Sequence, residues 1–197
     1  MTEFNTLGLS AQLVARVAAE GYETPTPIQA KAIPLVLEGR DVMGLAQTGT
    51  GKTAAFGLPI IDMLLANGGK PAPKTVKTLI LAPTRELVNQ IAENLRIFAR
   101  KTPLKVNIVV GGASINRQQQ QLAGGTDILV ATPGRLLDLL DRRALNLSAV
   151  RYLVLDEADQ MLDLGFIHDL KKISSLVPDE RQTMLFSATM PKSIAEL

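Results

Sequence analysis

The chain contains no cysteine, no apolar run long enough to span a bilayer and few aromatic residues. Without cysteine it can form neither a disulfide framework nor a thiolate metal site, a composition that suits a reducing compartment. A membrane span needs roughly 18 consecutive apolar residues. The N-terminus also lacks the basic and then apolar pattern of a secretory signal. We therefore expect a soluble, cytoplasmic protein that does not associate with membranes.

Aromatic residues make up 4% of the chain, as five phenylalanines and two tyrosines. Domains that read single-stranded nucleic acid by base stacking need several aromatic platforms. The net charge of +2 and the isoelectric point near 9.0 lie at the edge of the range for nucleic-acid-binding domains. If this chain binds nucleic acid, we expect it to grip the backbone.

Strand-like and helix-like segments alternate over the 197 residues, 46% of which are hydrophobic and 20% charged. That balance is typical of a globular domain. The alternation predicts βαβ units, and hence an α/β fold with a mostly parallel sheet and helices on both faces. The predicted strands are 42–46, 78–82, 106–110, 128–131, 152–155 and 183–186, and the predicted helices are 52–65, 85–99, 134–140 and 167–176.

Two further helices are predicted ahead of the first strand, at residues 10–20 and 27–37. Ser10 is a suitable N-cap for the first of them, and Gly21 and Gly39 are suitable stops.

We assign residues 1–38 to an N-terminal helical segment and residues 39–197 to the core of the same domain. Residues 67–77 are rich in glycine, proline and lysine, which predicts an exposed loop. The glutamine run 118–121 is interpreted as the polar face of a helix.

Two adjacent acids, Asp156 and Glu157, follow the apolar run 150–155, which predicts a buried parallel strand. Ligands of open α/β sheets collect at strand carboxyl ends. Adjacent acids are costly to desolvate there unless a positive group, most simply a metal ion, compensates. The alternative is a helix N-terminus in which both acids only complement the helix dipole.

A phosphate-binding motif follows the first predicted strand directly and opens a helix, as a P-loop requires. Glycines let backbone N–H groups wrap a phosphate, Lys52 would reach the β- and γ-phosphates, and Thr53 would give its hydroxyl to Mg²⁺. Ala46 replaces the first glycine of the usual pattern and is small enough to preserve the turn. The alternative is a glycine-rich loop that precedes Lys-Thr by chance. The motif consists of Ala46, Gln47, Thr48, Gly49, Thr50, Gly51, Lys52 and Thr53.

The P-loop gives the two acids a role. In P-loop NTPases an acid at the end of a neighbouring strand completes the Mg²⁺ shell, usually through water, so Asp156 and Thr53 are the candidate metal ligands. Glu157 then lies where it can orient and deprotonate a water that attacks the γ-phosphate. With Lys52, these acids form the candidate catalytic set, and two acids in succession favour hydrolysis. The sequence predicts an ATPase-type or GTPase-type site.

The order of these and several further motifs resembles the first RecA-like domain of a DEAD-box RNA helicase, over essentially the whole chain. Val88 departs from the alanine that is usual after Pro-Thr-Arg-Glu-Leu, a change that we expect to be neutral. Within the family the chain resembles the bacterial RhlE-type members. The matching segments, in order, are Phe4, 21–29 (Gly-Tyr-Glu-Thr-Pro-Thr-Pro-Ile-Gln), 46–53, 83–87 (Pro-Thr-Arg-Glu-Leu), 111–112 (Gly-Gly), 132–135 (Thr-Pro-Gly-Arg), 156–159 (Asp-Glu-Ala-Asp) and 187–189 (Ser-Ala-Thr).

The resemblance implies ATP as the nucleotide and assigns the adenine to residues near the N-terminus. A glutamine amide can pair with adenine N6 and N7, an arrangement that no guanine edge satisfies, and the resemblance gives this task to Gln29. Tyr22 would stack on the adenine, Phe4 would pack against the same region, and Thr24 belongs to the same motif. The alternative for Tyr22 is an aromatic side chain of the core.

The resemblance also implies RNA as a partner, bound through its backbone without sequence preference. Both arginine-containing motifs follow apolar strands and offer hydroxyls, an arginine and helix N-terminal amides, and glycine allows close approach of a sugar-phosphate chain. The alternative is plain N-capping by Thr84 and Thr132, and both interpretations can hold together. The candidate RNA-binding residues are Pro83, Thr84, Arg85, Gly112, Thr132, Gly134 and Arg135.

Ser187 and Thr189 end the last predicted strand beside the Asp156 strand. By resemblance, their hydroxyls would bind Asp159 and couple nucleotide state to domain closure. The alternative is an exposed turn between a strand and a loop. No catalytic role is expected for His168, the single histidine.

The resemblance further implies a second RecA-like domain, whose arginines would stabilise charge on the γ-phosphoryl group. No segment of this sequence duplicates those motifs. We therefore expect a domain-length fragment that alone binds adenine nucleotide weakly and turns it over barely. Two alternatives stay open, namely an ATP-gated RNA clamp or assembly factor, and an unrelated P-loop NTPase. The oligomeric state cannot be predicted.

Overall fold

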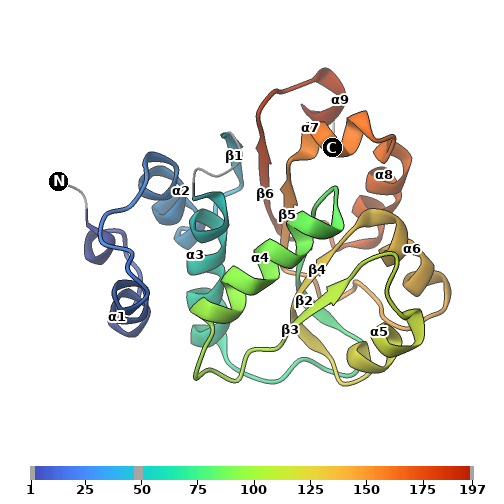
Figure 1. Cartoon of the computed structure of the whole chain (residues 1–197), viewed down its shortest axis with the longest axis horizontal. Coiled ribbons are helices and arrows are strands. Elements are labelled where there is room, and N and C mark those ends of the chain that lie inside the picture. Colours follow the sequence, from blue (N-terminus) through green and yellow to red (C-terminus); the bar gives the residue numbers. More distant parts are fainter. Residues whose placement is uncertain (1–2, 47–50, 196–197) are drawn as a thin grey trace.

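The structure, a computed structural model, describes residues 3–46 and 51–195. Six parallel strands form one sheet in the order β1-β6-β5-β2-β4-β3 (Figure 1). The strands are β1 (Val42–Leu45), β2 (Val76–Leu81), β3 (Val106–Val109), β4 (Thr126–Ala131), β5 (Tyr152–Asp156) and β6 (Gln182–Ser187). The predicted α/β fold with a parallel sheet is confirmed, and the predicted strands agree with the observed ones within two residues at each end.

Helices cover both faces of this sheet. They are η1 (Phe4–Thr6, a 3-10 helix), α1 (Ala11–Ala19), α2 (Pro27–Leu37), α3 (Lys52–Asn67), α4 (Arg85–Phe98), α5 (Ile115–Leu122), α6 (Pro133–Asp141), α7 (Ala158–Asp163), α8 (Ile167–Leu176) and α9 (Lys192–Ala195). The six helices predicted by residue range are present. The predictions did not include η1, α7 and α9, which are short segments without a clear apolar period.

Alternation of side chains along the strands builds two separate hydrophobic clusters. Ile80 of β2 and Val154 of β5 join the cluster under α1 to α4, whereas Leu79 and Leu153 join the cluster under α6, α7 and α8. Both faces are therefore buried, which explains why the strands are almost continuously apolar.

Several helix starts are set by the residues predicted to cap them. Ser10 accepts a hydrogen bond from Leu13 N, and Thr84 accepts one from Leu87 N. Thr26 and Gln29 form a reciprocal capping box at the start of α2. Since the first four N–H groups of a helix have no partner within it, these side chains fix where the helices begin.

Two details of the sequence interpretation need correction. The segment 67–77 is not all loop, because α3 extends to Asn67 and β2 already begins at Val76. In the glutamine run, Gln118 lies on the inner side of α5 and is buried, so the run is not simply a polar face. Its neighbour one turn later, Leu122, is also buried, as residues four apart share a helix face.

The N-terminal segment packs on the same core as the sheet. Phe4, Leu13 and Ile33 are buried in the cluster that also contains α3 and α4. Ser10 donates from its backbone N and its Oγ to the carboxylate of Asp62 on α3, at 2.6 Å and 2.7 Å. Gln29, at the end of residues 21–29, donates to Gly51 O directly before α3 and so lies beside the start of that helix.

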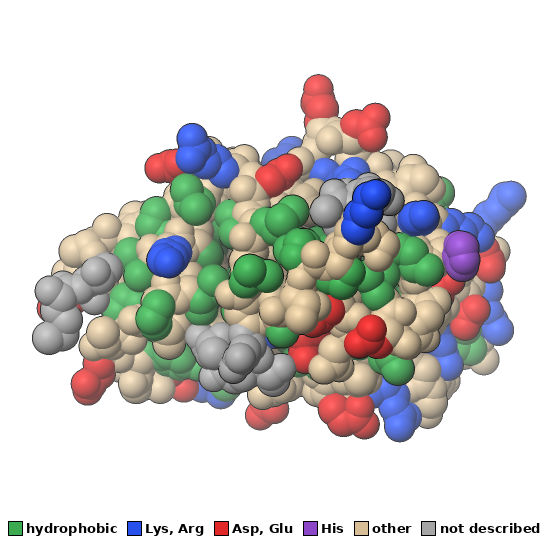
Figure 2. All heavy atoms as spheres, turned by 90° about the horizontal axis from the view of Figure 1, so that it is seen from above, with side chains coloured by type: hydrophobic (Ala, Val, Ile, Leu, Met, Phe, Trp, Pro, Cys, Tyr) green, Lys and Arg blue, Asp and Glu red, His purple; other side chains and the backbone are tan. Residues whose placement is uncertain are grey.

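Next to this segment, β1 is an edge strand with Met43 and Leu45 61% and 67% exposed. Seen from above, hydrophobic side chains lie open across the middle of the molecule, with charged side chains mostly around its margin (Figure 2). No helix in the part of the chain that the structure describes has both the length and the apolar character to cross a membrane.

Candidate functional site

The strand order brings the predicted chemical residues to one edge of the sheet. β1, β6 and β5 are neighbours, with Leu45 paired to Ser187 and Asp156 paired to Phe186. Ala46 N donates to Ser187 O at 3.0 Å, so the start of the predicted P-loop lies directly beside the end of β6. Carboxyl ends of parallel strands thus converge where a ligand of this fold class is expected.

A buried ion pair occupies this edge. Lys52 Nζ of α3 lies 3.0 Å from Asp156 Oδ1 of β5, and the two side chains are 5% and 1% exposed. Within the described residues, neither of these atoms has a hydrogen-bond partner apart from this contact. Burial raises the pKa of Asp156 above its ordinary value, while the neighbouring ammonium of Lys52 opposes that rise. The ammonium of Lys52 and the carboxylate of Asp156 thus lie together where water is largely excluded, and both can bind further ligands.

Gly51 caps α3 in a conformation that a glycine adopts without strain, with φ 81°. Gln29 Nε2 donates to Gly51 O at 3.2 Å, and Gln29 Oε1 accepts from Thr26 N at 3.0 Å. A Cβ added to Gly51 would come within 2.5 Å of Gln29 Nε2. The start of α3 therefore requires glycine, and the buried Gln29 is in direct contact with the predicted phosphate site.

Four of the predicted phosphate-binding residues, Gln47, Thr48, Gly49 and Thr50, lie outside the described residues. Thr53 is the second residue of α3 and is half-buried, one position after the buried Lys52.

The residues present fit Mg²⁺ and a nucleoside triphosphate. Lys52 Nζ and Asp156 Oδ1 are buried, with no other partners among the described residues, and the first turn of α3 offers backbone N–H groups next to them. No group of three metal-ligating side chains occurs among the described residues. That suits Mg²⁺, which keeps several waters and binds through one or two protein oxygens plus substrate phosphates.

Glu157 has backbone angles φ 51° and ψ 52°, a left-handed conformation that is uncommon for a residue with a side chain. It stands between the last residue of β5 and the first residue of α7. Such conformations cost of order 1–3 kcal/mol and cluster at functional sites. The chain thus reverses at Glu157, so that the half-buried Glu157 follows the buried Asp156 directly at the strand end.

The predicted adenine-contacting aromatics both take part in packing. Phe4 is 3% exposed within the core. Tyr22 is half-buried, with its ring centroid 5.6 Å from that of Phe98 in an edge-to-face arrangement. Thr24 is exposed. These contacts agree with the alternative that Tyr22 is an aromatic side chain of the core. Adenine contacts by Phe4, Tyr22 and Thr24 stay predictions.

Asp159 and the end of β6 form a compact polar cluster. Asp159 N donates to Ser187 Oγ at 3.2 Å, and Thr189 donates to Asp159 Oδ2 from both its N and its Oγ1, each at 3.2 Å. Burial acts to raise the pKa of Asp159, but hydrogen bonds from Ser187, Gln160 and Thr189 outweigh it and bring that pKa below its ordinary value. The structure thus brings together the three residues predicted to couple nucleotide state to closure.

The predicted RNA-binding residues gather at the carboxyl ends of β2, β4 and β3. Arg85 Nη1 lies 3.5 Å from Gly111 O, and Arg135 Nη1 donates to Ala113 O at 2.9 Å. A Cβ added at Gly112, whose φ is 81°, would collide with Arg85 Nη1. The absence of a side chain at Gly112 therefore leaves room for the guanidinium. The two arginines, from α4 and α6, therefore meet at one turn.

The other residues of this set differ in accessibility. Thr132 precedes α6 without a side-chain capping bond, and Gly134 is half-buried, so both present polar groups at the helix start. Thr84 is also half-buried and caps α4 with its hydroxyl. Pro83 is buried, which leaves its side chain a packing role.

Sequence reasoning missed Gln118, whose side chain reaches this same turn from α5. Its only signal was its position four residues before the apolar Leu122. His168, for which no catalytic role is expected, is exposed on α8 at one end of the upper face (Figure 2).

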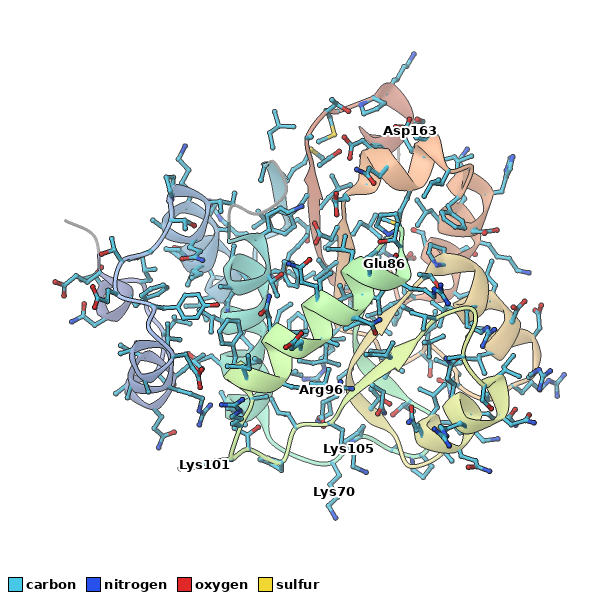
Figure 3. The ribbon with its side chains drawn as sticks, in the orientation of Figure 1. Lys70, Glu86, Arg96, Lys101, Lys105 and Asp163 are labelled. Carbon is cyan, nitrogen blue, oxygen red and sulfur yellow. The ribbon has the colours of Figure 1, made fainter. Side chains whose placement is uncertain are left out.

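Not all charge lies at this edge. Lys70, Lys101 and Lys105 lie near the amino ends of the strands, on the far side of the molecule from Glu86 at the start of α4 (Figure 3). Arg85 and Arg135, in contrast, both contact the turn at the carboxyl ends of the strands. These lysines therefore lie away from the edge of the sheet that carries the predicted site residues.

Paired acids at a strand end, a buried lysine opposite them and a helix that begins at the glycine of the motif define a P-loop nucleotide-binding domain. The comparisons agree. A family model described as DEAD/DEAH box helicase matches residues 26–197. The "DEAD-box ATP-dependent RNA helicase CshA" of two Streptococcus pneumoniae strains, TIGR4 and R6, is 50% identical over 195 residues, 99% of this chain and 36% of the relative.

A solved structure of a DEAD box protein from the hyperthermophile Methanococcus jannaschii matches with a TM-score of 0.91 and 40% identity, over 100% of this chain and 52% of that one. The chain belongs to the DEAD/DEAH box helicase family, and the expected RecA-like fold is confirmed. It spans between about a third and a half of the length of these relatives. The resemblance to RhlE-type members is not tested by these matches and stays a prediction.

Proposed function

We propose that this chain is the ATP-binding domain of an RNA-dependent ATPase that separates short RNA duplexes. The observation that carries the proposal is the buried pair of Lys52 and Asp156 on the same sheet edge as the turn that Arg85 and Arg135 hold. A nucleotide site and a backbone-binding site share one rigid sheet. Similarity to helicases of the family supports RNA as the polymer.

Each residue at the nucleotide site has a defined task in this proposal. When nucleotide binds, the ammonium of Lys52 moves away from Asp156 and binds the β- and γ-phosphates. Thr53 and Asp156 would hold Mg²⁺, which would supply positive charge to neutralise the phosphates. Glu157 accepts the proton of the attacking water, and Gln29 selects adenine by turning its amide from Gly51 to the base.

At the second site, Arg85 and Arg135 bind phosphates while Gly112, Thr132 and Gly134 allow close approach of the sugar-phosphate chain. Such contacts carry no base identity, so binding is independent of sequence. A second RecA-like domain, for which the greater length of the relatives leaves room, would complete the site across the γ-phosphate. Cytoplasmic location remains part of the proposal.

The adenine assignment is tested by Gln29→Ala, with the exposed Gln12→Ala as the matched control. We expect ATP affinity to fall about tenfold in Gln29→Ala, the order expected when a two-bond base contact is lost, while Gln12→Ala leaves it unchanged. Binding of ATP and GTP is measured by calorimetry, and the preference for ATP should shrink. An unchanged ATP affinity would contradict the assignment of Gln29 to the adenine.

A further inference from the structure

The turn that follows β3 is held from three sides. Gly111, Gly112 and Ala113 connect β3 to α5, and Arg85 of α4 and Arg135 of α6 each donate to a carbonyl of this turn. Three helices thus converge on backbone that a nucleic acid would approach. The third contact comes from α5 itself, through Gln118.

Gln118 is a buried polar side chain, 5% exposed, whose amide is used at both ends. Gln118 Nε2 donates to Val110 O at 2.9 Å, and Gln118 Oε1 accepts from Arg135 Nη1 at 3.2 Å. Val110 immediately precedes the Gly-Gly turn. One side chain therefore ties the start of the turn to the arginine that binds its end.

This arrangement orients the guanidinium of Arg135. Its Nη1 has two N–H groups, which point to Ala113 O and to Gln118 Oε1. Nε and Nη2 have no hydrogen-bond partner among the described residues. The free side of a planar guanidinium fork is suited to bind a phosphate through two parallel hydrogen bonds.

We propose that Gln118 is a positioning residue for RNA binding, which holds Arg135 and the Gly111–Gly112 turn in the geometry that receives one backbone phosphate. The inference rests on the proposed RNA-binding function and adds to it the group that sets the geometry. Gln118 itself does not touch the RNA. It acts through Arg135.

The test is a double-mutant cycle in the intact protein, with a short fluorescent oligouridylate as probe and a non-hydrolysable ATP analogue present. Gln118→Met keeps the length of the side chain and removes both hydrogen bonds. We expect it to weaken RNA binding about tenfold, the order of one or two lost hydrogen bonds, and to leave ATP affinity unchanged. The exposed Gln120→Met on the same helix is the matched control and should bind RNA as the wild type does.

Arg135→Ala should weaken binding at least as much, and adding Gln118→Met to it should cause no further loss, because Gln118 acts through that arginine. Gln118→Glu should also reduce the dependence of log affinity on log salt by about one phosphate contact, since its carboxylate engages the guanidinium.

The outcomes separate this inference from the proposed function. If Gln118→Met binds RNA as the wild type does while Arg135→Ala binds weakly, or if the two losses add, the positioning role is wrong and RNA binding stands. A parallel loss of ATP affinity in Gln118→Met would show a general folding defect and would equally overturn the specific role. If the wild type itself does not bind the oligouridylate, the proposed function fails.

Discussion

Lys52 and Asp156 show how a functional site is held ready at the scale of single residues. Each charge is almost fully desolvated, and each is compensated by the other across 3.0 Å. A buried pair of this kind adds little net stability, but removal of one member leaves an uncompensated charge. Ligand phosphates and a metal would supply further partners for both groups.

The first prediction concerns this pair. Lys52→Met should lower the free energy of unfolding by up to about 3–5 kcal/mol and abolish ATP binding, because Asp156 is left buried and unpaired. Lys52→Met combined with Asp156→Asn should recover most of the stability but not the binding. Urea denaturation at neutral pH measures the stability of both variants, and calorimetric titration with ATP measures their binding. A single variant as stable as the wild type, or a double variant less stable than the single, would contradict this description.

The second prediction concerns pH and Asp159. Because the pKa of Asp159 is lowered in the folded state, the unfolded chain binds more protons, and the contribution of this carboxylate is present above its unfolded pKa. It is lost as pH falls through the folded pKa. Asp159→Asn, a neutral isostere, should therefore be less stable than the wild type at pH 7, and the difference should shrink below about pH 4. Denaturation of both proteins across this range tests the sign, and a difference that grows on acidification would refute it.

At the scale of elements, the contact between α1 and α3 links the N-terminal segment to the helix that carries Lys52. Ser10 caps α1 and at the same time donates two hydrogen bonds to Asp62, 52 residues further along the chain. Hydrogen bonds to a charged acceptor contribute about 1.5–3 kcal/mol each, net of the water contacts that they replace. This contact is a polar anchor of α1 on α3, and Gln29 adds a second one through Gly51 O.

The third prediction follows from that anchor. Asp62→Ala should lower the free energy of unfolding by about 1–3 kcal/mol and Ser10→Ala by about 1 kcal/mol. In the double variant the losses should be less than additive, since both remove the same contact. ATP affinity should fall as well, because Gln29 depends on how this segment packs on α3. The control is the exposed Glu93→Ala on α4, which should change neither quantity.

Elements and their order along the chain were predictable, but their long-range pairings were not. Apolar periods located the strands, and the rule for strand carboxyl ends placed Asp156 at the edge of the sheet where a ligand binds. The ion pair between Asp156 and Lys52 was not predicted. Ser10–Asp62 and Gln118–Arg135 join positions 52 and 17 residues apart, and no local period encodes such partners. The left-handed backbone of Glu157 was equally invisible, because a Glu at that position carries no turn signal of the kind that Gly or Asn gives.

At the scale of the whole molecule, one parallel sheet brings the proposed nucleotide site and the proposed backbone-binding turn to the same edge. The strand order places β1, β6 and β5 under the first site and β2, β4 and β3 under the second. The Ser187–Thr189–Asp159 cluster lies at the end of β6, within the first group. Because the sheet is rigid, the two sites can be coupled only through the side chains at its edge and through a segment that closes over both sites.

The measurement that tests the central claim most directly is steady-state ATP hydrolysis by this 197-residue chain, with and without single-stranded RNA, beside the intact protein and its Glu157→Gln variant. We predict negligible turnover by the chain under both conditions. The intact protein should show RNA-stimulated turnover, reduced about 10²–10⁴-fold in Glu157→Gln because the general base is lost. Robust RNA-stimulated hydrolysis by the chain alone would contradict the account, since the catalytic site would then be complete without a second domain.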